Sequence, residues 1–461
     1  MPIVFPRELM VSVSGFRGRV GDPLTPELVA SLAAGFGAFL GKGREGVRVL
    51  LGRDSRTSGP MLARSAMAGL QSVGCDVLDL GMVSTPTLLL AVEDQEAEGG
   101  IVVTASHNPG EWNALKLASG EGMFLDGPTM AAFQTYLQEE DPPRAAWDEL
   151  GSVRRDPGAV DRHLDRILTL PHLDVPALKE RGFRVAVDCV NGAGGLIMPQ
   201  LLGALGCQVV GVATEPHGRF QRDPEPTAAN LRRFGDVVKE EGAELGLAVD
   251  PDADRLSLVD ETGTPLGEDL TLALASAAVL ARTPGVVVTN LSTSQVVDDV
   301  ARSFGQGVVR APVGEINVAR RMQKEGAVVG GEGNGGVILP RLHFTRDAPL
   351  AAALVLQHLL AQDTTVGGAV GRWPSYAILK RKVSFPREAL RDAYRALEAD
   401  LEPPSTNRED GLRMTWEEER IWLHVRPSGT EPVVRLIAEA PEEGDAVAIL
   451  DRASEILQGV A

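Results

Sequence analysis

One arrangement of residues occurs three times between residues 47 and 312 of the chain. Each copy consists of a β-rich run, a polar or glycine-containing turn, a helical stretch, a glycine, a second β-rich run and a proline. Strand, helix and strand joined in this way form a βαβ unit, and the right-handed crossover makes the two strands parallel. The repeat therefore predicts an α/β protein built from three related units. The copies begin with VRVLLG (47–52), FRVAVD (183–188) and GVVVTN (285–290).

Each copy is followed by a helical stretch and another apolar run that ends in an unusual loop. In open α/β sheets, ligands bind beyond the carboxyl ends of the strands. If the three units are copies of one fold, the three loops occupy equivalent positions, and we expect them to face one site. The loops lie in GIVVTASHNPG (100–110), LGLAVDPDADR (245–255) and AVVGGEGNGG (327–336).

After residue 371 the sequence changes character. YAILKRKVSF and ERIWLHVRPSGTEPVVRLIAEA alternate as antiparallel strands do, around a helical stretch at 387–400, and a last helix is expected near 442–458. This predicts a smaller α+β domain. A chain of 461 residues also exceeds what one hydrophobic core usually serves. We predict four domains, at 1–155, 156–261, 262–371 and 372–461.

The composition narrows the class of partner. The chain has 45 basic and 63 acidic residues, a net charge of −18, which disfavours binding to nucleic acids and to anionic membranes. The longest apolar runs, 270–281 and 348–361, are too short to span a bilayer and predict buried helices. Three cysteines without a motif indicate neither a disulfide framework nor a zinc cluster. With no signal-peptide pattern at the N-terminus, we expect a cytoplasmic protein.

DPDADR (250–255) is the clearest metal signal. Asp250, Asp252 and Asp254 alternate, so their carboxylates can converge on one cation, and carboxylate oxygens are ligands for Mg²⁺ or Ca²⁺. The loop does not continue as an EF-hand, since Arg255 stands where that loop has glycine. The alternative is a solvated acidic turn.

TASHNPGEWNALK (104–116) places Ser106 on a loop without a GxSxG elbow. A nucleophilic serine needs a base or a metal nearby. His107 and Lys116 are close in sequence, and the aspartates are candidates from another unit. The alternative is that Ser106 caps a helix and Lys116 is a surface lysine.

Two further loops carry groups suited to a sugar phosphate. In GGEGNGGVI (330–338), Glu332 and Asn334 can bind sugar hydroxyls, and the glycines allow close approach of the backbone; the alternative is a turn without function. RPSGTEPVVR (426–435) combines guanidinium, hydroxyl and backbone N–H groups suited to a phosphate dianion; the alternative is a surface hairpin. The groups in this loop belong to Arg426, Ser428, Gly429, Thr430 and Arg435.

Taken together, TASHNPGEWNALK, DPDADR, GEGNGG and RPSGTEP, with SGFRG near the N-terminus, resemble the α-D-phosphohexomutase family over essentially the whole chain. The resemblance implies four domains around a central cleft, three of them homologous. It implies that Ser106 becomes a phosphoserine and that the three aspartates bind one Mg²⁺ together with the phosphate. The implied reaction interconverts hexose 6-phosphate and hexose 1-phosphate through a bisphosphate, with a hexose bisphosphate as activator.

The same resemblance assigns the remaining residues. Glu332 and Asn334 would hold sugar hydroxyls, and the loop from Arg426 to Thr430 would bind the phosphate that is not transferred. Lys116 would take part in acid/base chemistry. The residues lining the transfer site would be Arg17, His107, Lys116 and Arg255.

The chain departs from the family pattern at several positions. Ala114 and Pro251 stand where the family usually has glycine, which affects the shape of their loops. Asn334 and Gly336 replace the serine and histidine of the familiar bacterial sugar loop. GEGNGG resembles the branch with archaeal-type phosphoglucosamine mutases, which favours glucosamine over mannose or glucose. Two other classes stay open: a Mg²⁺-dependent sugar phosphatase, and a silent sugar-phosphate binding protein, against which the combination of Ser106, the aspartates and Lys116 speaks.

Overall fold

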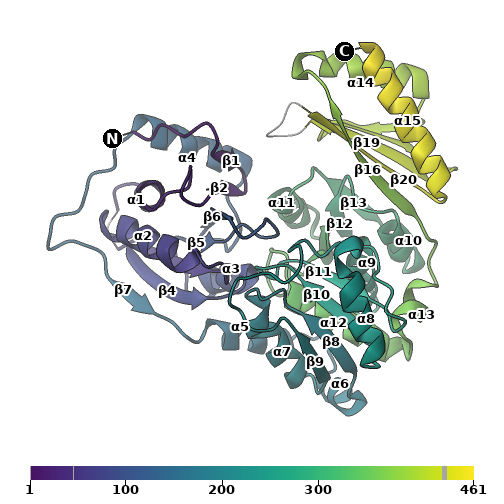
Figure 1. Ribbon diagram of the computed structural model, residues 1–461, viewed down its shortest axis with the longest axis horizontal. Coiled ribbons are helices and arrows are strands. Elements are labelled where there is room, and N and C mark those ends of the chain that lie inside the picture. The colour runs from purple at the N-terminus through teal and green to yellow at the C-terminus, as the bar shows by residue number, and fades with distance from the viewer. Residues whose placement is uncertain (1, 45, 428–432, 461) are drawn as a thin grey trace.

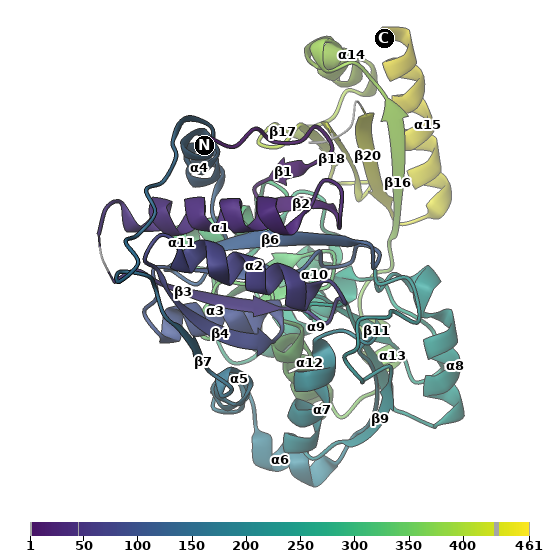
Figure 2. The same cartoon turned by 60° about the vertical axis from the view of Figure 1, so that its left-hand side comes forward.

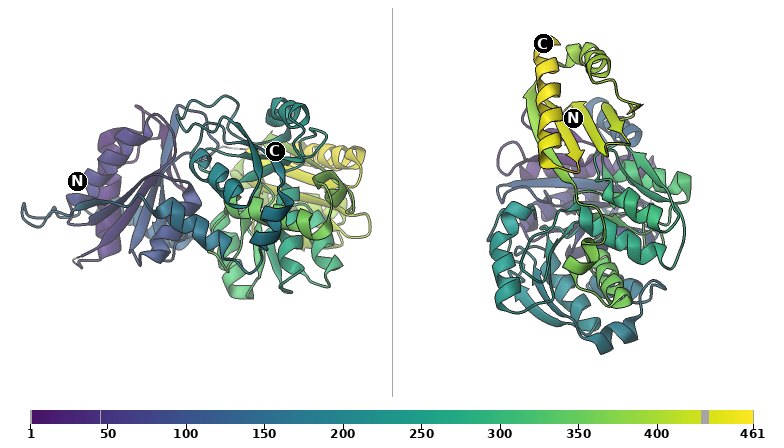
Figure 3. Two further views of the ribbon diagram at one scale, coloured as in Figure 1. Left: turned by 90° about the horizontal axis from the view of Figure 1, so that it is seen from below. Right: turned by 90° about the vertical axis from the view of Figure 1, so that its right-hand side faces the viewer.

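The computed structural model describes residues 2–44, 46–427 and 433–460. In this part of the chain, three α/β units are followed by a smaller antiparallel unit, which confirms the predicted fold class. Figure 3 shows the first unit at one end of the molecule and the other three gathered at the opposite end. In Figure 1 the C-terminal unit lies beside the third unit, above it in the view.

The first unit has a seven-stranded sheet with the order β1-β2-β6-β5-β3-β4-β7. Successive side chains of a strand point to opposite faces, so Val49 and Leu51 pack with α1, α2 and α4, whereas Leu50 packs with α3. The sheet is therefore covered on both faces. The strands are β1 (Met10–Ser12), β2 (Gly15–Arg19), β3 (Arg48–Arg53), β4 (Asp76–Met82), β5 (Gly99–Val103), β6 (Trp112–Ser119) and β7 (Val153–Arg155). The helices are α1 (Pro26–Gly41), α2 (Gly59–Gln71), α3 (Thr85–Asp94) and α4 (Gly127–Glu139).

The second and third units each have a four-stranded sheet. The second contains α5 (Ala159–Leu168), α6 (Val175–Arg181), β8 (Arg184–Asp188), α7 (Gly194–Ala204), β9 (Gln208–Val212), a 3₁₀ turn (Ala228–Leu231), α8 (Arg232–Glu240), β10 (Leu245–Val249) and β11 (Leu256–Val259). The third contains α9 (Asp269–Leu280), β12 (Val287–Asn290), α10 (Val296–Ser303), β13 (Val308–Ala311), α11 (Glu315–Glu325), β14 (Val329–Glu332), β15 (Gly336–Ile338), α12 (Ala348–Gln362) and α13 (Val366–Val370).

The same four-stranded core occurs in all three units. Its order is β6-β5-β3-β4 in the first, β11-β10-β8-β9 in the second and β15-β14-β12-β13 in the third. In each core the first strand is antiparallel to its neighbour and the other three are parallel. The hairpin between the first two strands carries TASHNPG, DPDADR or GEGNGG. The predicted equivalence of the three loops is thus confirmed.

The second and third units share one apolar core, in which α9 and α12 are buried along most of their length. Both predicted buried helices are therefore confirmed. The first unit joins them through a buried histidine cluster at the amino end of α12. Thr87 Oγ1 lies 2.9 Å from His163 Nδ1, and His163 Nε2 and His343 Nε2 lie 2.7 and 2.9 Å from Asp347 Oδ2.

The C-terminal unit has a five-stranded antiparallel sheet with the order β16-β20-β19-β18-β17, and Figure 2 shows it standing above the other units. Polar contacts join it to the third unit: Ser292 Oγ lies 2.8 Å from His424 Nδ1, and Gln295 N–H donates to Glu439 at 3.0 Å. No helix in the described ranges has the length and apolar character needed to cross a membrane. The elements are β16 (Ala377–Ser384), a 3₁₀ turn (Arg387–Ala389), α14 (Leu390–Leu401), β17 (Ser405–Asn407), β18 (Leu412–Trp416), β19 (Ile421–Pro427), β20 (Val433–Ala440) and α15 (Glu443–Val460).

Candidate active site

Ser106 lies in the β5–β6 loop and is 3% exposed. Its φ of 49° falls in the left-handed region, which a non-glycine residue keeps only where its surroundings enforce it. The hydroxyl donates a hydrogen bond of 2.7 Å to Asp250 Oδ2 and lies 3.4 Å from His107 Nδ1. The structure thus joins the predicted nucleophile to the predicted metal loop.

The Ser106 loop is held by Arg56, which is fully buried. The Arg56 Nε donates to Asp54 Oδ2 at 3.0 Å, and the same carboxylate oxygen accepts the Thr104 hydroxyl at 2.6 Å. Arg56 is not among the residues predicted from the sequence. The feature of the sequence that could have indicated Arg56 is the charged turn RDSRTSG. This turn follows the 47–52 run, and that run ends at the same edge of the sheet as the Ser106 loop. The other Arg56 nitrogens donate to the carbonyl oxygens of Ser106 (2.5 Å), Asn108 (2.6 Å), Pro109 (2.6 Å) and Trp112 (3.0 Å).

The three aspartates of DPDADR converge in a fully buried cluster, with one oxygen of each within 4.8 Å of the others. Burial and the neighbouring carboxylates raise the pKa of Asp250. Burial is also the largest single influence on Asp252 and acts in the same direction, but the Lys116 ammonium and the hydrogen bonds of Asp252 together outweigh burial and hold the pKa of Asp252 below its ordinary value. The cluster therefore concentrates three carboxyl groups, of which Asp252 is paired with Lys116 and Asp254 with Arg346.

The hydrogen bonds of the cluster leave room for a cation. Asp252 Oδ2 accepts from Lys116 Nζ at 2.7 Å, and Asp254 Oδ2 accepts from Arg346 at 2.6 Å. The other oxygens, Asp252 Oδ1 and Asp254 Oδ1, are buried and accept no hydrogen bond from the described residues. Buried carboxylate oxygens without donors fit a hard divalent cation such as Mg²⁺.

Thr85, at the start of α3 in the first unit, makes two hydrogen bonds to the metal loop of the second unit. Its hydroxyl donates to Asp252 Oδ2 at 2.6 Å, and its N–H donates to the Asp252 carbonyl at 2.9 Å. Thr85 is not among the residues predicted from the sequence. Its only signal was its place beside the proline that ends the first repeat.

Two predicted arginines and one predicted histidine lie in or beside the Ser106 loop and the metal loop. Arg17 donates to Asn108 Oδ1 in the Ser106 loop at 2.6 Å. Arg255 lies 3.7 Å from Asp254 Oδ1, and its Nε has no hydrogen-bond partner among the described residues. Burial, with the charges of Arg255 and Arg17, lowers the pKa of His107 to about 2, so its ring is neutral.

The sugar loop between β14 and β15 lies against the metal loop. The Leu256 N–H donates to the Gly335 carbonyl at 2.9 Å, which ties the two hairpins together. Glu332 is 3% exposed, and Arg346 donates to its Oε2 at 2.9 Å. Asn334 Nδ2 lies 3.4 Å from the same oxygen. Glu332 and Asn334 thus lie side by side next to the metal loop, and their binding of sugar hydroxyls stays a prediction.

Asn290 and Gly314 complete the fixation of Glu332. The Asn290 side chain and the Gly314 N–H each donate to Glu332 Oε1 at 2.9 Å. Neither residue was singled out from the sequence. Both follow strands of the third repeat, Asn290 at the end of β12 and Gly314 shortly after β13.

The predicted phosphate loop joins β19 and β20. Ser428, Gly429 and Thr430 lie outside the described residues. Arg426 faces Arg435 across the two strands, and Arg426 is paired with Asp410 at 3.1 Å. Among the described residues, the side-chain partner of Arg426 is Asp410 of its own unit.

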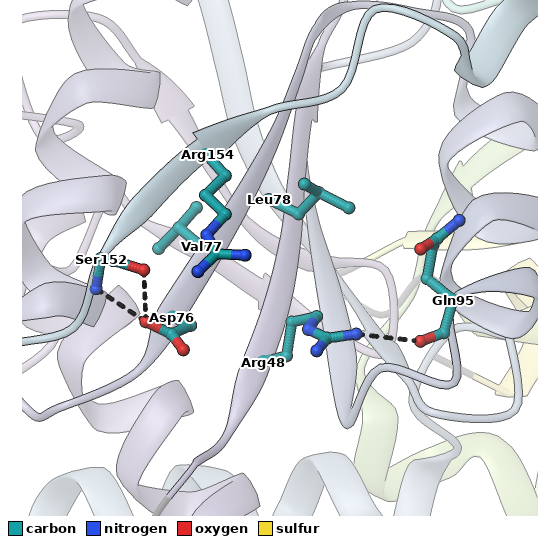
Figure 4. A pocket seen from close by; sticks show the side chains of 7 residues that line it. All are labelled: Arg48, Asp76, Val77, Leu78, Gln95, Ser152 and Arg154. Atoms are coloured by element: carbon teal, nitrogen blue, oxygen red, sulfur yellow. Dashed lines mark hydrogen bonds between the residues drawn. The ribbon is translucent and has the colours of Figure 1, made fainter.

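Two of the hollows that border the first unit differ in their position relative to the Ser106 loop. One, of about 660 Å³, borders the Ser106 loop at Pro109 and Gly110 and the second unit at Arg219 and Phe220. The other, of about 290 Å³, is drawn in Figure 4 and is lined by Arg48, Asp76 and Arg154, among others. Arg48 and Asp76 begin β3 and β4, so this second pocket lies at the opposite end of the strands from the Ser106 loop.

The order of the units, the three equivalent hairpins and the serine–aspartate contact together identify the family. The family descriptions "Phosphoglucomutase/phosphomannomutase, alpha/beta/alpha domain" I, II and III match residues 9–144, 161–263 and 267–376. The description of its C-terminal domain matches residues 382–455. The chain belongs to the phosphoglucomutase/phosphomannomutase family. It is a phosphohexomutase, an isomerase that acts by phosphoryl transfer.

Individual members of the phosphoglucomutase/phosphomannomutase family match the chain from end to end. A "Phosphoglucomutase/phosphomannomutase" of Thermococcus kodakarensis is 37% identical over 96% of this chain and 97% of its own. A "Probable phosphoglucosamine mutase" of Methanopyrus kandleri is 36% identical with the same coverage. The crystal structure of a family protein from Burkholderia thailandensis has a TM-score of 0.84, with 26% identity and 98% coverage of both chains.

Proposed function

We propose that this phosphohexomutase depends on Mg²⁺, carries its phosphoryl group on Ser106 and interconverts glucosamine 6-phosphate and glucosamine 1-phosphate. The observation that carries the proposal is the 2.7 Å contact of the Ser106 hydroxyl with Asp250, inside a trio of buried carboxylates. A phosphate on this hydroxyl would bring a charge of about −1.5 to −2 against those carboxylates. Such a group is stable there only with a divalent cation between them.

Asp250, Asp252 and Asp254 would hold that cation together with the Ser106 phosphate. When bound, Mg²⁺ offsets the charge of the transferring phosphoryl group and orients it. Lys116 and Arg346 fix one oxygen of Asp252 and of Asp254, which leaves the other oxygen of each for the metal. The carboxylates are thus oriented before the cation arrives.

In the first transfer, a free hydroxyl of the hexose monophosphate attacks the phosphorus of phospho-Ser106. The bond from phosphorus to the sugar oxygen forms as the bond to Ser106 Oγ breaks, which yields a hexose bisphosphate. Lys116 gives a proton to Ser106 Oγ and regains one from the attacking hydroxyl, so the proton count is unchanged. Arg17 and Arg255 offset the charge of the phosphoryl group.

The second transfer reverses the roles. The bisphosphate turns over, and its other phosphate returns to Ser106, so that phosphate has moved between C1 and C6. Arg426, Arg435 and the loop between them bind whichever phosphate is not reacting, while Glu332 and Asn334 bind sugar hydroxyls. A hexose bisphosphate also restores phospho-Ser106 after its loss, which makes it an activator.

The choice of glucosamine rests on the GEGNGG loop and on the names of the relatives. The proteins from Methanopyrus kandleri, Pyrococcus abyssi and Methanosarcina acetivorans are each named "Probable phosphoglucosamine mutase". A second candidate, interconversion of glucose or mannose phosphates, is favoured by the 37% identity to the Thermococcus kodakarensis protein.

The test is a parallel assay of the purified protein with Mg²⁺ and a hexose bisphosphate primer on glucosamine 6-phosphate, glucose 1-phosphate and mannose 1-phosphate. We expect kcat/KM for glucosamine 6-phosphate to exceed the other two by at least about 10-fold. The reverse order supports the second candidate. Release of inorganic phosphate without isomerisation contradicts both.

A further inference from the structure

Arg346 lies between the metal loop and the sugar loop and is 7% exposed. Its Nη2 donates to Asp254 Oδ2 at 2.6 Å, and its Nη1 donates to Glu332 Oε2 at 2.9 Å. Its Nε lies 3.2 Å from Glu315 Oε2, at the start of α11. One guanidinium thus contacts carboxylates from three segments: the β10–β11 hairpin, the end of β14 and α11.

The position of this guanidinium is fixed from several sides. The Arg346 N–H donates to Glu315 Oε1 at 2.9 Å, and the next residue, Asp347, caps α12 by accepting from the Leu350 N–H at 2.9 Å. A Cβ atom added at Gly336 would lie 2.1 Å from Arg346 Cδ, so glycine at this position leaves the space that the side chain occupies. The Arg346 side chain is therefore packed between the two hairpins and is not a mobile surface side chain.

The geometry suits arginine and not lysine. A planar guanidinium presents its N–H groups in a fixed fork, so Nη1 and Nη2 of Arg346 each donate to a different carboxylate. An ammonium is a point charge that could pair with Asp254 or with Glu332, but it would not hold the two at a set spacing. Without a guanidinium or an ammonium at position 346, the buried carboxylates of Asp254, Glu315 and Glu332 would repel one another and move apart.

We propose that Arg346 is a positioning residue that couples the metal loop to the sugar loop. One arm holds Asp254 so that its second oxygen faces the cation, and the other holds Glu332 beside Asn334. Binding of the cation and ordering of the sugar loop are then linked, and such linkage is reciprocal. The coupling rests on the proposed role of the aspartates as metal ligands, and its catalytic consequence rests also on the proposed role of Glu332.

The first experiment measures the coupling without activity. Amide hydrogen exchange in residues 330–338 is followed with and without MgCl₂ in the wild type, in Arg346→Lys and in the control Arg413→Lys. Arg413 is a buried arginine at 9% exposure whose guanidinium lies over Trp422 in the C-terminal unit. We expect Mg²⁺ to slow exchange at least about 3-fold in the wild type and in Arg413→Lys, but not in Arg346→Lys. Equal slowing in Arg346→Lys, or none in the wild type, overturns the proposal.

A second variant covers the case in which Arg346→Lys fails to fold. Gly336→Ala keeps the guanidinium and its charge but occupies the space beside Arg346 Cδ. It should likewise weaken the effect of Mg²⁺ on residues 330–338. If full coupling persists in Gly336→Ala with the side chain displaced in its crystal structure, the guanidinium does not transmit the effect.

The catalytic arm is a double-mutant cycle on kcat/KM. Arg346→Lys and Glu332→Gln should each lower kcat/KM about 10- to 100-fold. The kcat/KM of the double variant should lie no more than about 3-fold below that of the less active single variant. Arg413→Lys combined with Glu332→Gln should show the product of the two separate effects. Multiplicative effects of Arg346→Lys and Glu332→Gln contradict coupling. If the wild type has no mutase activity but Mg²⁺ still slows amide exchange in residues 330–338, the result contradicts the proposed function and leaves the coupling intact.

Discussion

The Ser106 hydroxyl and the Asp250 carboxylate lie 2.7 Å apart although 144 positions separate the two residues in the sequence. Ser106 is in the β5–β6 hairpin, and Asp250 begins the β10–β11 hairpin, which is its counterpart in the second unit. The contact therefore joins equivalent loops of two copies of one sheet. Repetition of one α/β core in the chain thus builds a hydroxyl–carboxylate contact that neither unit contains by itself.

Replacing Ser106 by alanine should abolish mutase activity, by at least about 10³-fold in kcat, because the phosphoryl carrier is lost. A coupled assay for the hexose phosphate product measures the effect, and circular dichroism confirms the fold. Ser276→Ala is the matched control, since Ser276 is buried in α9 with a hydroxyl that lacks a hydrogen-bond partner among the described residues. A fully active Ser106→Ala enzyme would remove this serine from the chemistry.

Replacing Asp252 by asparagine should raise the Mg²⁺ concentration for half-maximal activity at least about 10-fold, because a charged ligand is lost and Lys116 loses its partner. Titration of MgCl₂ into the EDTA-treated enzyme measures this, and EDTA alone should silence the wild type. Asp236→Asn, at an exposed position of α8, is the control. An unchanged titration for Asp252→Asn would place the metal elsewhere.

Replacing Arg56 by methionine should lower the free energy of unfolding by about 3–5 kcal/mol, because Asp54 is left as a buried charge without its partner. Four carbonyl oxygens of the Ser106 loop also lose their donor, so activity should fall with stability. Urea denaturation gives the free energy. Arg64→Met, at an exposed position of α2, should stay close to the wild type, and a loss of equal size there would mean that Arg56 has no special role.

Replacing Arg426 by alanine should mainly raise KM for the hexose phosphate, at least about 10-fold, because the guanidinium binds the phosphate that does not react. Steady-state kinetics separate KM from kcat. Arg408→Ala removes an exposed arginine of the same unit and should leave both unchanged. A variant that keeps its KM and loses kcat would place Arg426 at the reacting phosphate instead.

The pH dependence of stability should include a contribution from His424 at the junction of the third and C-terminal units. Burial lowers the pKa of His424 to about 4, against about 6.5 in the unfolded chain. A depressed folded-state pKa means that stability is complete above pH 6.5 and is lost as the pH falls towards 4, by about 2 kcal/mol between pH 7 and pH 4.5.

His424→Gln isolates this contribution. The stability advantage of the wild type over His424→Gln, from urea denaturation, should shrink as the pH is lowered from 7 to 4.5. An advantage that stays constant or grows over that range would show that His424 is not held neutral.

The repeat made much of this arrangement predictable. Alternating aspartates follow one apolar strand and the Ser106 loop follows another, and the residue types in both indicate their chemistry. The repeat predicts that the two loops lie at equivalent hairpins. The supporting residues carry no such signal. Arg56 acts on backbone carbonyls of residues about 50 positions away, and Arg346 bridges loops 92 and 14 positions away. These contacts depend on tertiary packing, within the first unit for Arg56 and between the second and third units for Arg346 and Asp254, which local sequence does not encode.

The most direct test of the central claim is to follow a phosphate through Ser106. The protein is incubated with Mg²⁺ and hexose 1,6-bisphosphate labelled in its phosphates, and the labelled peptide is mapped by mass spectrometry before and after a chase with unlabelled hexose monophosphate. We expect the label on Ser106 and its transfer to the sugar during the chase. Isomerisation of the hexose phosphate at full rate without label on Ser106 would contradict the account.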